Sequence, residues 1–320
     1  MDFLRRLFKP KEETKDEEEK TDEETFGGPN DGPVTTPLPG SPPQTDNPQT
    51  RPLEAPKEFK SKNQLIRFGM ASDTGRVRSN NQDAAMTLLT GFETSANMPT
   101  LGLFIVADGM GGHTDGEIAS AVAVQTIANR VLTEVIRPHL MGQPPSADQR
   151  SIPEVLSDAM NAANESVQIE VPNGGTTATV VGVRGDLAFI SHVGDSRAYL
   201  VTDGINIELI TRDHSLVLRL QELNQITEEE AEFHPQKNVL YRAIGQNTSL
   251  EADAATRRLP PASSLVICSD GLWGQITEND ILTALKESSS PQEACDRLVE
   301  LANANGGPDN ITVVVIEMPE

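Results

Sequence analysis

The chain is 320 residues long, is 37% hydrophobic and carries a formal net charge of −22. This length allows one large domain or two small ones, and the apolar content is enough for a buried core. The negative charge argues against binding to a nucleic-acid backbone, because Lys and Arg make most of the contacts to phosphate in such complexes. The excess of carboxylates fits two explanations, solubility or a field that concentrates divalent cations, and composition leaves both open.

The two cysteines, Cys268 and Cys295, are predicted to be reduced structural thiols, because they form neither a disulfide framework nor a Cys-x-x-Cys metal site. Residues 1–8 are apolar and basic but too short for a signal peptide, and no apolar run approaches the length of a membrane span. We therefore expect a soluble, cytoplasmic and monomeric protein. An alternative for residues 3–9 is a short amphipathic turn that touches a membrane or a partner.

Residues 1–60 are predicted to form a disordered extension. Residues 12–24 are an acidic run of charged side chains, and residues 27–56 are rich in Pro, Gly, Thr and Asn. Neither composition buries enough apolar surface to offset the entropy lost when a chain becomes ordered. We therefore assign residues 61–320 to one folded domain.

The first half of this domain is predicted to contain strands and then helices. The strands are expected over residues 65–71, from Asp83 onward and over residues 101–107, with a polar turn at residues 72–80. An apolar stripe at three- and four-residue spacing predicts a helix from Asp115 to about Arg137 that ends before Pro138. A capping box that starts at Ser151 predicts a second helix, to about residue 170.

From Gly175 the hydrophobic pattern changes to a period of two. Strands are expected over residues 177–183, 187–193, 197–202 and 205–210. Short turns containing Gly and Asp join them, which predicts an antiparallel meander and excludes a simple doubly wound parallel sheet. The polar residues 213–238, with a capping box at Thr227, predict a mobile helical flap.

The last part of the chain is predicted to alternate strands and helices. Strands are expected over residues 252–257, 265–269 and 311–316, and helices are expected to open at Thr277 and Ser290, the latter with a capping box. Together these elements predict an α+β domain in which an antiparallel β-sandwich is flanked on both sides by helices.

Acidic residues at the ends of apolar strands carry the strongest chemical signal. Asp108 and Asp270 each end such a strand and precede Gly, and Asp309 stands just before another strand. A single Asp-Gly pair, such as the one at Asp203, is more often a turn than a ligand. Several carboxylates at strand ends would nevertheless be costly without a cation, and hard divalent metals prefer such oxygen ligands.

Other patterns narrow the chemistry. Arg78 lies five residues before Asp83, where it either forms a surface ion pair or holds a phosphate with its planar guanidinium. The sequence has no Gly-x-Ser-x-Gly elbow, phosphate-binding P-loop or His-Glu-x-x-His motif. Mechanisms that use a nucleophilic serine, a nucleotide or a protease-type zinc therefore have no support.

Taken together, several motifs resemble those of the bacterial metal-dependent protein phosphatase family, type 2C. They occur in the family's order and span about residues 65–317, at residues 72–83, 108–113, 175–178, 193–198, 267–273 and 307–312. The resemblance implies a β-sandwich flanked by helices, and it makes residues 61–320 a phosphatase catalytic domain. It also implies a centre of two Mg²⁺ or Mn²⁺ ions, with a possible third.

The resemblance also implies a role for each site residue. Asp108 would bridge both ions, the Gly109 carbonyl would bind one, and Asp270 and Asp309 would bind the other. Asp83 would hold metal-bound waters, Asp195 with Asp270 would form the third-metal position, and Arg78 would hold the substrate phosphate. Arg78 and Asp108 are thus the predicted catalytic residues.

The implied function is hydrolysis of phosphoserine and phosphothreonine in proteins by a hydroxide that bridges the two metals. The implied partners are phosphorylated proteins and a bacterial Ser/Thr kinase that the enzyme opposes. Two alternatives stay open. One is a pseudophosphatase that binds phosphoproteins without turnover, and the other is a small-molecule phosphatase with the same centre.

Two residues depart from the family pattern. Gln82 stands where eukaryotic relatives often have Glu, which removes one negative charge from the metal shell. Met110 stands where those relatives have a His proposed as general acid, so the general acid is unidentified. We expect His113 to anchor the Gly-rich turn rather than to take that role. No signal marks His139, His192 or His214, whereas His234 lies in the flap and can approach substrate.

Overall fold

The structure is a computed structural model that describes residues 65–91, 99–112, 114–142 and 150–320. The extension predicted over residues 1–60 lies outside the described residues, and so does His113. Within the described residues, no helix is long and apolar enough to cross a membrane.

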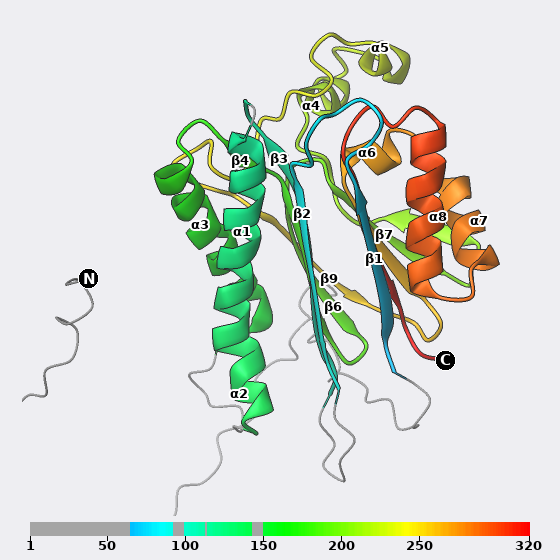
Figure 1. Cartoon of the computed structure of the whole chain (residues 1–320). Helices are drawn as coiled ribbons and strands as arrows, with labels where there is room; N and C mark the ends of the chain where they lie inside the picture. Colours follow the sequence, from blue (N-terminus) through cyan, green and yellow to red (C-terminus); the bar gives the residue numbers. More distant parts are fainter. Residues whose placement is uncertain (1–64, 92–98, 113, 143–149) are drawn as a thin grey trace, which may run out of the picture. The chain divides into compact units, whose positions relative to one another are not determined.

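Two antiparallel sheets form the centre of the domain (Figure 1). The first sheet has the strand order β1 (Arg67–Asp73), β11 (Ile311–Glu317), β10 (Ser264–Cys268), β7 (Arg197–Thr202) and β8 (Asn206–Leu209). The second sheet has the order β2 (Asp83–Thr90), β3 (Leu101–Met110), β5 (Ala178–Arg184), β6 (Leu187–Val193) and β9 (Asp253–Arg258), and β4 (Gly175–Thr176) pairs with β3.

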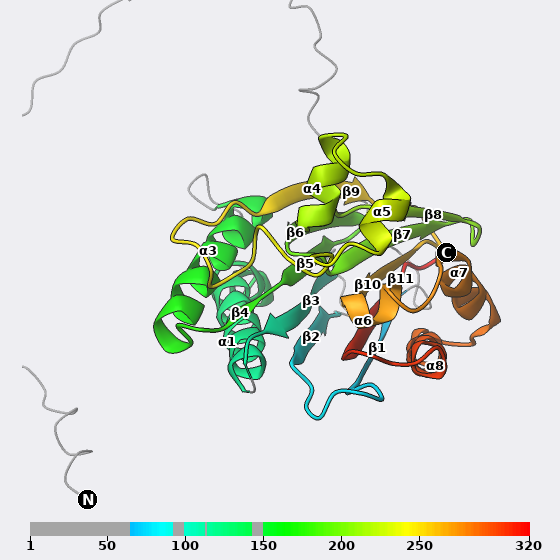
Figure 2. The ribbon, with the colours of Figure 1, turned by 90° about the horizontal axis from the view of Figure 1, so that it is seen from above.

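Helices cover the outer face of each sheet (Figure 2). The second sheet is covered by α1 (Asp115–Val131) and α3 (Ile152–Glu170), and α1 continues into the π-helical turn η2 (Leu132–Ile136) and α2 (Arg137–Leu140). The first sheet is covered by α7 (Glu278–Glu287) and α8 (Pro291–Ala304), with the short α6 (Asp270–Trp273) nearby. The polar residues 213–238 contain α4 (Leu216–Glu222) and α5 (Glu228–Glu232).

Side-chain alternation along the strands explains the layers. In β3, Leu103 and Ile105 pack against the helices, whereas Phe104 and Val106 pack between the sheets. Because successive strand residues point to opposite faces, a strand that is buried on both faces must be apolar throughout. The predicted helix–sheet–sheet–helix sandwich is therefore confirmed.

The predicted four-strand meander is wrong. The strands β5 and β6 pair in the second sheet, whereas β7 and β8 pair in the first. Residues 194–196 thus carry the chain from one sheet to the other instead of closing a hairpin. Gly194 has a φ of +109°, and a Cβ atom there would lie 2.5 Å from the Thr177 side chain. Glycine permits this crossing because it has no side chain to clash.

The helix predicted to end before Pro138 continues to Leu140. The π-helical turn η2 ends at Ile136, and Pro138 occupies the first turn of α2, which begins at Arg137. A π-helical turn changes the pattern of backbone hydrogen bonds before the proline. In the first turn of a helix the backbone N–H has no partner within the helix, so a proline there costs no hydrogen bond. The helix therefore continues past Pro138 without a break.

Two of the three predicted capping boxes form in full. Full capping boxes join Ser151 to Glu154 and Thr227 to Glu230. At Ser290 only half of the box forms, because the Glu293 carboxylate accepts the backbone N–H of Ser289 (2.8 Å) instead. The predicted mobility of residues 213–238 stays a prediction.

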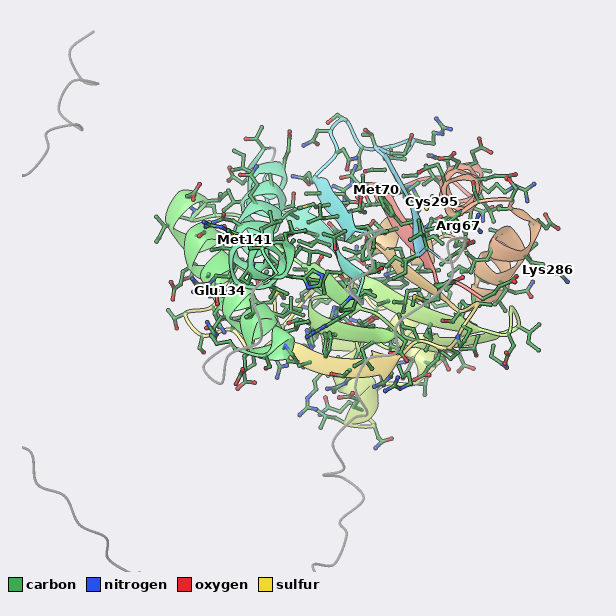
Figure 3. All side chains as sticks on the ribbon, turned by 90° about the horizontal axis from the view of Figure 1, so that it is seen from below. Arg67, Met70, Glu134, Met141, Lys286 and Cys295 are labelled. Atoms are coloured by element: carbon green, nitrogen blue, oxygen red, sulfur yellow. The ribbon has the colours of Figure 1, made fainter. Side chains whose placement is uncertain are left out.

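Both cysteines are buried and free, as the sequence predicted. Cys268 lies on β10, and Cys295 lies on α8, where Figure 3 labels it. Burial raises the pKa of each thiol to about 12, so both stay protonated at neutral pH.

Candidate metal centre

A cavity of about 200 Å³ opens where β3 and β10 end and β11 begins. The residues predicted for a metal and phosphate site line it, and they are Arg78, Asp108, Gly109, Asp195, Asp270 and Asp309. Asp83 lies opposite Asp108 in the β2–β3 register. Segments from distant parts of the sequence therefore bring their carboxylates to one edge of the sandwich.

The backbone of Asp108 is held on both sides by two threonines. Its N–H donates to Thr177 Oγ1 (2.9 Å), and its carbonyl accepts the Thr177 N–H (2.8 Å) and the Thr176 hydroxyl (2.9 Å). Both threonines are buried. The carboxylate of Asp108 thus extends from a fixed backbone, which reduces the reorganisation that ligand binding requires.

Gly109 marks a close approach between the end of β3 and the start of α1. A Cβ atom at this position would lie 2.1 Å from the Gly116 carbonyl oxygen and 2.6 Å from that of Gln82. The Gly109 N–H donates to the same Gln82 oxygen (3.1 Å). Only glycine lets the strand end and the helix start meet at this distance.

Asp83 is half-buried, and only one of its two carboxylate oxygens has a hydrogen-bond partner. Its Oδ2 accepts the Ser269 hydroxyl (2.8 Å), whereas its Oδ1 is buried without a hydrogen-bond partner. Burial raises the pKa of Asp83 to about 7, against the hydrogen bonds that favour its charged form. Such a group is stabilised by a nearby cation.

The neighbouring carboxylates of Asp108, Asp195 and Asp270 also lack compensating positive charge. Burial raises the pKa of Asp108 well above its usual range, and neighbouring carboxylates add to the shift. The pKa of Asp195 is raised to about 8, first by burial and then by the charges of Asp270 and Asp213. The pKa of Asp270 is also raised, and its buried Oδ1 has no hydrogen-bond partner.

Arg78 supplies positive charge at the cavity. Its Nη2 donates to Asp309 Oδ2 (2.6 Å), and about half of the Arg78 side chain is exposed. The ion pair considered from the sequence, with Asp83, therefore forms with Asp309 instead. This hydrogen bond is the main cause that raises the pKa of the guanidinium.

The donor set fits hard divalent cations. Clustered carboxylates with unpartnered buried oxygens are the environment that Mg²⁺ and Mn²⁺ neutralise. Among the described residues, however, no three acidic, His or Cys side chains are grouped closely enough to hold one ion. Carbonyl and water oxygens are common further ligands of such ions.

Several residues that support the site had no predicted role. The Asn310 side chain accepts the Gln82 N–H (2.8 Å) and donates to the carbonyls of Thr74 and Asn80 (2.9 Å each). It therefore ties the loop that carries Arg78 to the start of β11. In the sequence, Asn310 directly follows Asp309 in the motif at residues 307–312. Only the aspartate of that motif was predicted to have a role.

Trp273 and Arg197 support Asp195 in a similar way. The indole N–H donates to the Asp195 carbonyl (3.0 Å), and the Arg197 guanidinium lies 3.7 Å from the centre of the Trp273 ring. Arg197 also pairs with the buried Asp213 (2.8 Å). Residues 194–196, where the chain crosses between the sheets, are thus held by a contact with Trp273, on whose ring Arg197 stacks.

Two buried histidines, His192 and His214, occupy structural positions. His192 and His214 stack with ring centres 5.1 Å apart, and His214 Nδ1 accepts the Gly194 N–H (3.1 Å). Burial lowers the pKa of His192 to about 4, so it is neutral at pH 7. His234 accepts a local N–H from Gln236 (3.2 Å) and is not among the residues that line the cavity.

Met110 lines the cavity but carries no transferable proton. Its sulfur accepts the Gln246 side-chain amide (3.2 Å). The structure therefore offers no general acid at this position. The nearby Gln82 side chain lies against the start of α1, where its amide nitrogen would be 2.6 Å from a Cβ atom at Gly116.

Comparisons with known proteins assign the family. The family model for protein phosphatase 2C matches residues 68–311. The chain belongs to the protein phosphatase 2C family. It is 34% identical to a serine/threonine phosphatase of Listeria monocytogenes, an alignment that covers 77% of this chain and 93% of that protein.

Solved structures of phosphatases have the same fold. The Mycobacterium tuberculosis serine/threonine phosphatase PstP/Ppp is 34% identical, with a TM-score of 0.65, over 80% of this chain and 99% of that one. A PstP catalytic domain in complex with two manganese ions is 32% identical, with a TM-score of 0.63, over 80% and 99% of the two chains. The chain is thus a protein phosphatase of the 2C type, a metal-dependent family.

Proposed function

We propose that this phosphatase hydrolyses phosphoserine and phosphothreonine in proteins. The observation that carries the proposal is the cavity at the sandwich edge, where partly buried carboxylates with unpartnered oxygens meet one exposed arginine. The names of the relatives support the choice of serine and threonine esters. A Ser/Thr kinase would supply the phosphorylated proteins, so the two enzymes would act in opposition.

The carboxylates would hold divalent ions, Mg²⁺ or Mn²⁺. Asp108, the Gly109 carbonyl, Asp270 and Asp309 are the proposed ligands of two ions, and Asp195 with Asp270 would hold a third. Asp83 would orient waters of the centre. Bound ions would supply positive charge that activates a water and stabilises the phosphoryl oxygens. The manganese complex of a solved relative supports this assignment.

The proposed task of Arg78 is to bind and orient the substrate phosphate. Only its Nη2 donates to another described residue, so Nε and Nη1 remain for a ligand. A guanidinium matches the oxygens of a phosphate with paired N–H donors. Because Met110 has no acidic proton, we propose that water protonates the leaving oxygen of serine or threonine.

Hydrolysis of p-nitrophenyl phosphate and of a phosphothreonine peptide tests the proposal. We expect activity with Mn²⁺ that excess EDTA abolishes, and a loss of at least about a hundredfold in Asp108→Asn and Asp270→Asn. Asp186→Asn is the matched control, because Asp186 is also buried but pairs with Arg258 and does not line the cavity. Full activity in EDTA, or an unaffected Asp270→Asn variant, would contradict the proposal.

The same assay separates the alternatives that the sequence left open. Tight phosphopeptide binding without turnover would favour a pseudophosphatase. Faster hydrolysis of sugar phosphates than of phosphopeptides would favour a small-molecule phosphatase. We expect neither, because an open cavity with an exposed arginine suits a side-chain phosphate on a protein.

A further inference from the structure

A second cavity, of about 510 Å³, is lined by several arginines although the chain as a whole is acidic. It lies between α4 and residues 241–251. Three arginines line it, namely Arg212, Arg219 and Arg242, and the lining includes one acidic residue, Glu251. Such a cluster of arginines around a cavity, in a protein with a net charge of −22, is a candidate anion site.

Three carboxylates, Glu222, Glu251 and Asp253, pair with these arginines, and all of these ion pairs are exposed or partly exposed. Glu222 is shared, because it accepts from Arg212 Nε (2.7 Å) and from Arg219 Nη1 (3.2 Å). Arg242 pairs with Glu251 (3.1 Å) and with Asp253 (3.2 Å), whose side chains are 81% and 42% exposed. Exposed ion pairs are weakened by solvent and salt, so a multiply charged anion competes well for these guanidinium groups.

Neutral donors complete the lining. Tyr241, Thr248 and Ser249 also line the cavity, and their hydroxyls make no hydrogen bond to another described residue. Phosphate oxygens accept several hydrogen bonds at once, and guanidinium with hydroxyl donors is a common combination around them. The chemistry of the lining therefore favours a phosphate group over a single carboxylate.

Shared residues connect this cavity with the metal centre. Leu240 lines the metal centre, and the next residue, Tyr241, lines the arginine cavity. A third cavity has lining residues in common with both, namely Met110 with the metal centre and Asn247 with the arginine cavity. An extended peptide with one side chain at the metal centre can thus follow this surface to the arginines.

We propose that the arginine cavity binds a second phosphate group on a multiply phosphorylated peptide substrate. This subsite rests on the proposed function, because the first phosphate of the same peptide occupies the metal centre. The second phosphate takes guanidinium donors from Arg212, Arg219 and Arg242. It displaces part of their pairing with Glu222, Glu251 and Asp253. The subsite directs the enzyme towards segments that carry clustered phosphates.

Peptides with one and two phosphates test this subsite in the full-length protein. Each peptide carries the same phosphothreonine. A second position, placed at increasing distances from the phosphothreonine across the series, holds phosphoserine, Glu or Ala. We expect kcat/KM for the doubly phosphorylated peptide to be about tenfold higher at the best spacing. The peptide with Glu should gain much less.

Three variants separate anion binding from general effects. Arg219→Ala should remove most of the preference and leave p-nitrophenyl phosphate hydrolysis unchanged. Arg130→Ala is the matched control, because Arg130 is similarly exposed and pairs with a nearby Glu on its own helix, away from the cavity. Glu222→Gln should increase the preference, since it removes the competing carboxylate, whereas a structural role for Glu222 predicts a decrease.

The peptide assays can support or overturn the second phosphate site. An equal preference in Arg219→Ala and Arg130→Ala, no preference in the wild type, or an equal gain from Glu would overturn the subsite. Binding of the labelled doubly phosphorylated peptide is also measured by fluorescence anisotropy in EDTA, where turnover is absent. We expect about tenfold weaker binding by Arg219→Ala. An absence of phosphatase activity would refute the proposed function alone, because this binding difference still decides the subsite.

Discussion

The hydroxyl of Thr177 offers a sharp test of how the fold positions the metal centre. It accepts the backbone N–H of Asp108 (2.9 Å) and contacts the Ser196 hydroxyl (2.8 Å) in a buried setting. Replacement by the similarly shaped Val leaves the buried N–H of Asp108 without a partner. A buried unsatisfied donor costs about 1–3 kcal/mol. We expect Thr177→Val to lower the free energy of unfolding by this amount.

The same change should also disturb the carboxylate of Asp108, because its backbone loses one of the contacts that fix it. If about 1.4 kcal/mol of the loss reaches the metal centre, the Mn²⁺ concentration for half-maximal activity rises about tenfold. Urea unfolding in EDTA measures the first effect, and a Mn²⁺ titration of activity measures the second. Thr177→Ser keeps the hydroxyl and should retain a Mn²⁺ requirement close to that of the wild type.

Thr211→Val is the control for this prediction. Thr211 is also buried, and its hydroxyl accepts the backbone N–H of Ala198 (3.0 Å), but Thr211 does not line the cavity. It should lose comparable stability without a change in Mn²⁺ requirement. If Thr177→Val needs no more Mn²⁺ than Thr211→Val, the threonine does not position Asp108, and the reasoning fails.

Two further predictions concern packing and pH. Gly109→Ala should destabilise the chain by at least about 1–3 kcal/mol in urea unfolding, because the new Cβ atom would meet the Gly116 carbonyl at 2.1 Å; an unchanged midpoint would contradict this close approach. Burial lowers the pKa of His192 to about 4, so the unfolded chain binds the proton first and stability falls as the pH drops from about 6.5 towards 4. This loss should amount to roughly 1 kcal/mol per pH unit in the wild type and be smaller in His192→Asn, measured by urea unfolding across that range.

The sandwich was predictable because a strand that is buried on both faces is apolar at nearly every position of the sequence. Strands such as β3 are continuous apolar runs, whereas α3 opens with a capping box at Ser151. The partner sheet of each strand was not predictable, since a Gly-Asp pair serves both a hairpin and a crossing. At Gly194 the deciding contact is with Thr177, which a local pattern does not contain.

The carboxylates of the site were predictable for a related reason. Asp108 and Asp270 follow apolar strands, and the sheets bring those strand ends to one edge. Their supports were not predictable, because they join residues far apart in sequence. Asn310, for example, donates to the Thr74 carbonyl across 236 positions, and Trp273 reaches Asp195 across 78. Residue type and spacing indicate a ligand, but only the fold reveals its support.

The two cavities would neutralise phosphate in different ways. At the metal centre the carboxylates outnumber the single arginine, so a phosphate is attracted there only when divalent ions supply the missing charge. In the arginine cavity the positive charge belongs to the chain, because guanidinium groups stay protonated at any physiological pH. Docking of the second phosphate is therefore independent of metal supply but sensitive to salt, whereas hydrolysis of the first depends on metal. An enzyme built in this way would hold clustered phosphates before its ions are bound, and the metal concentration would then set the rate of hydrolysis.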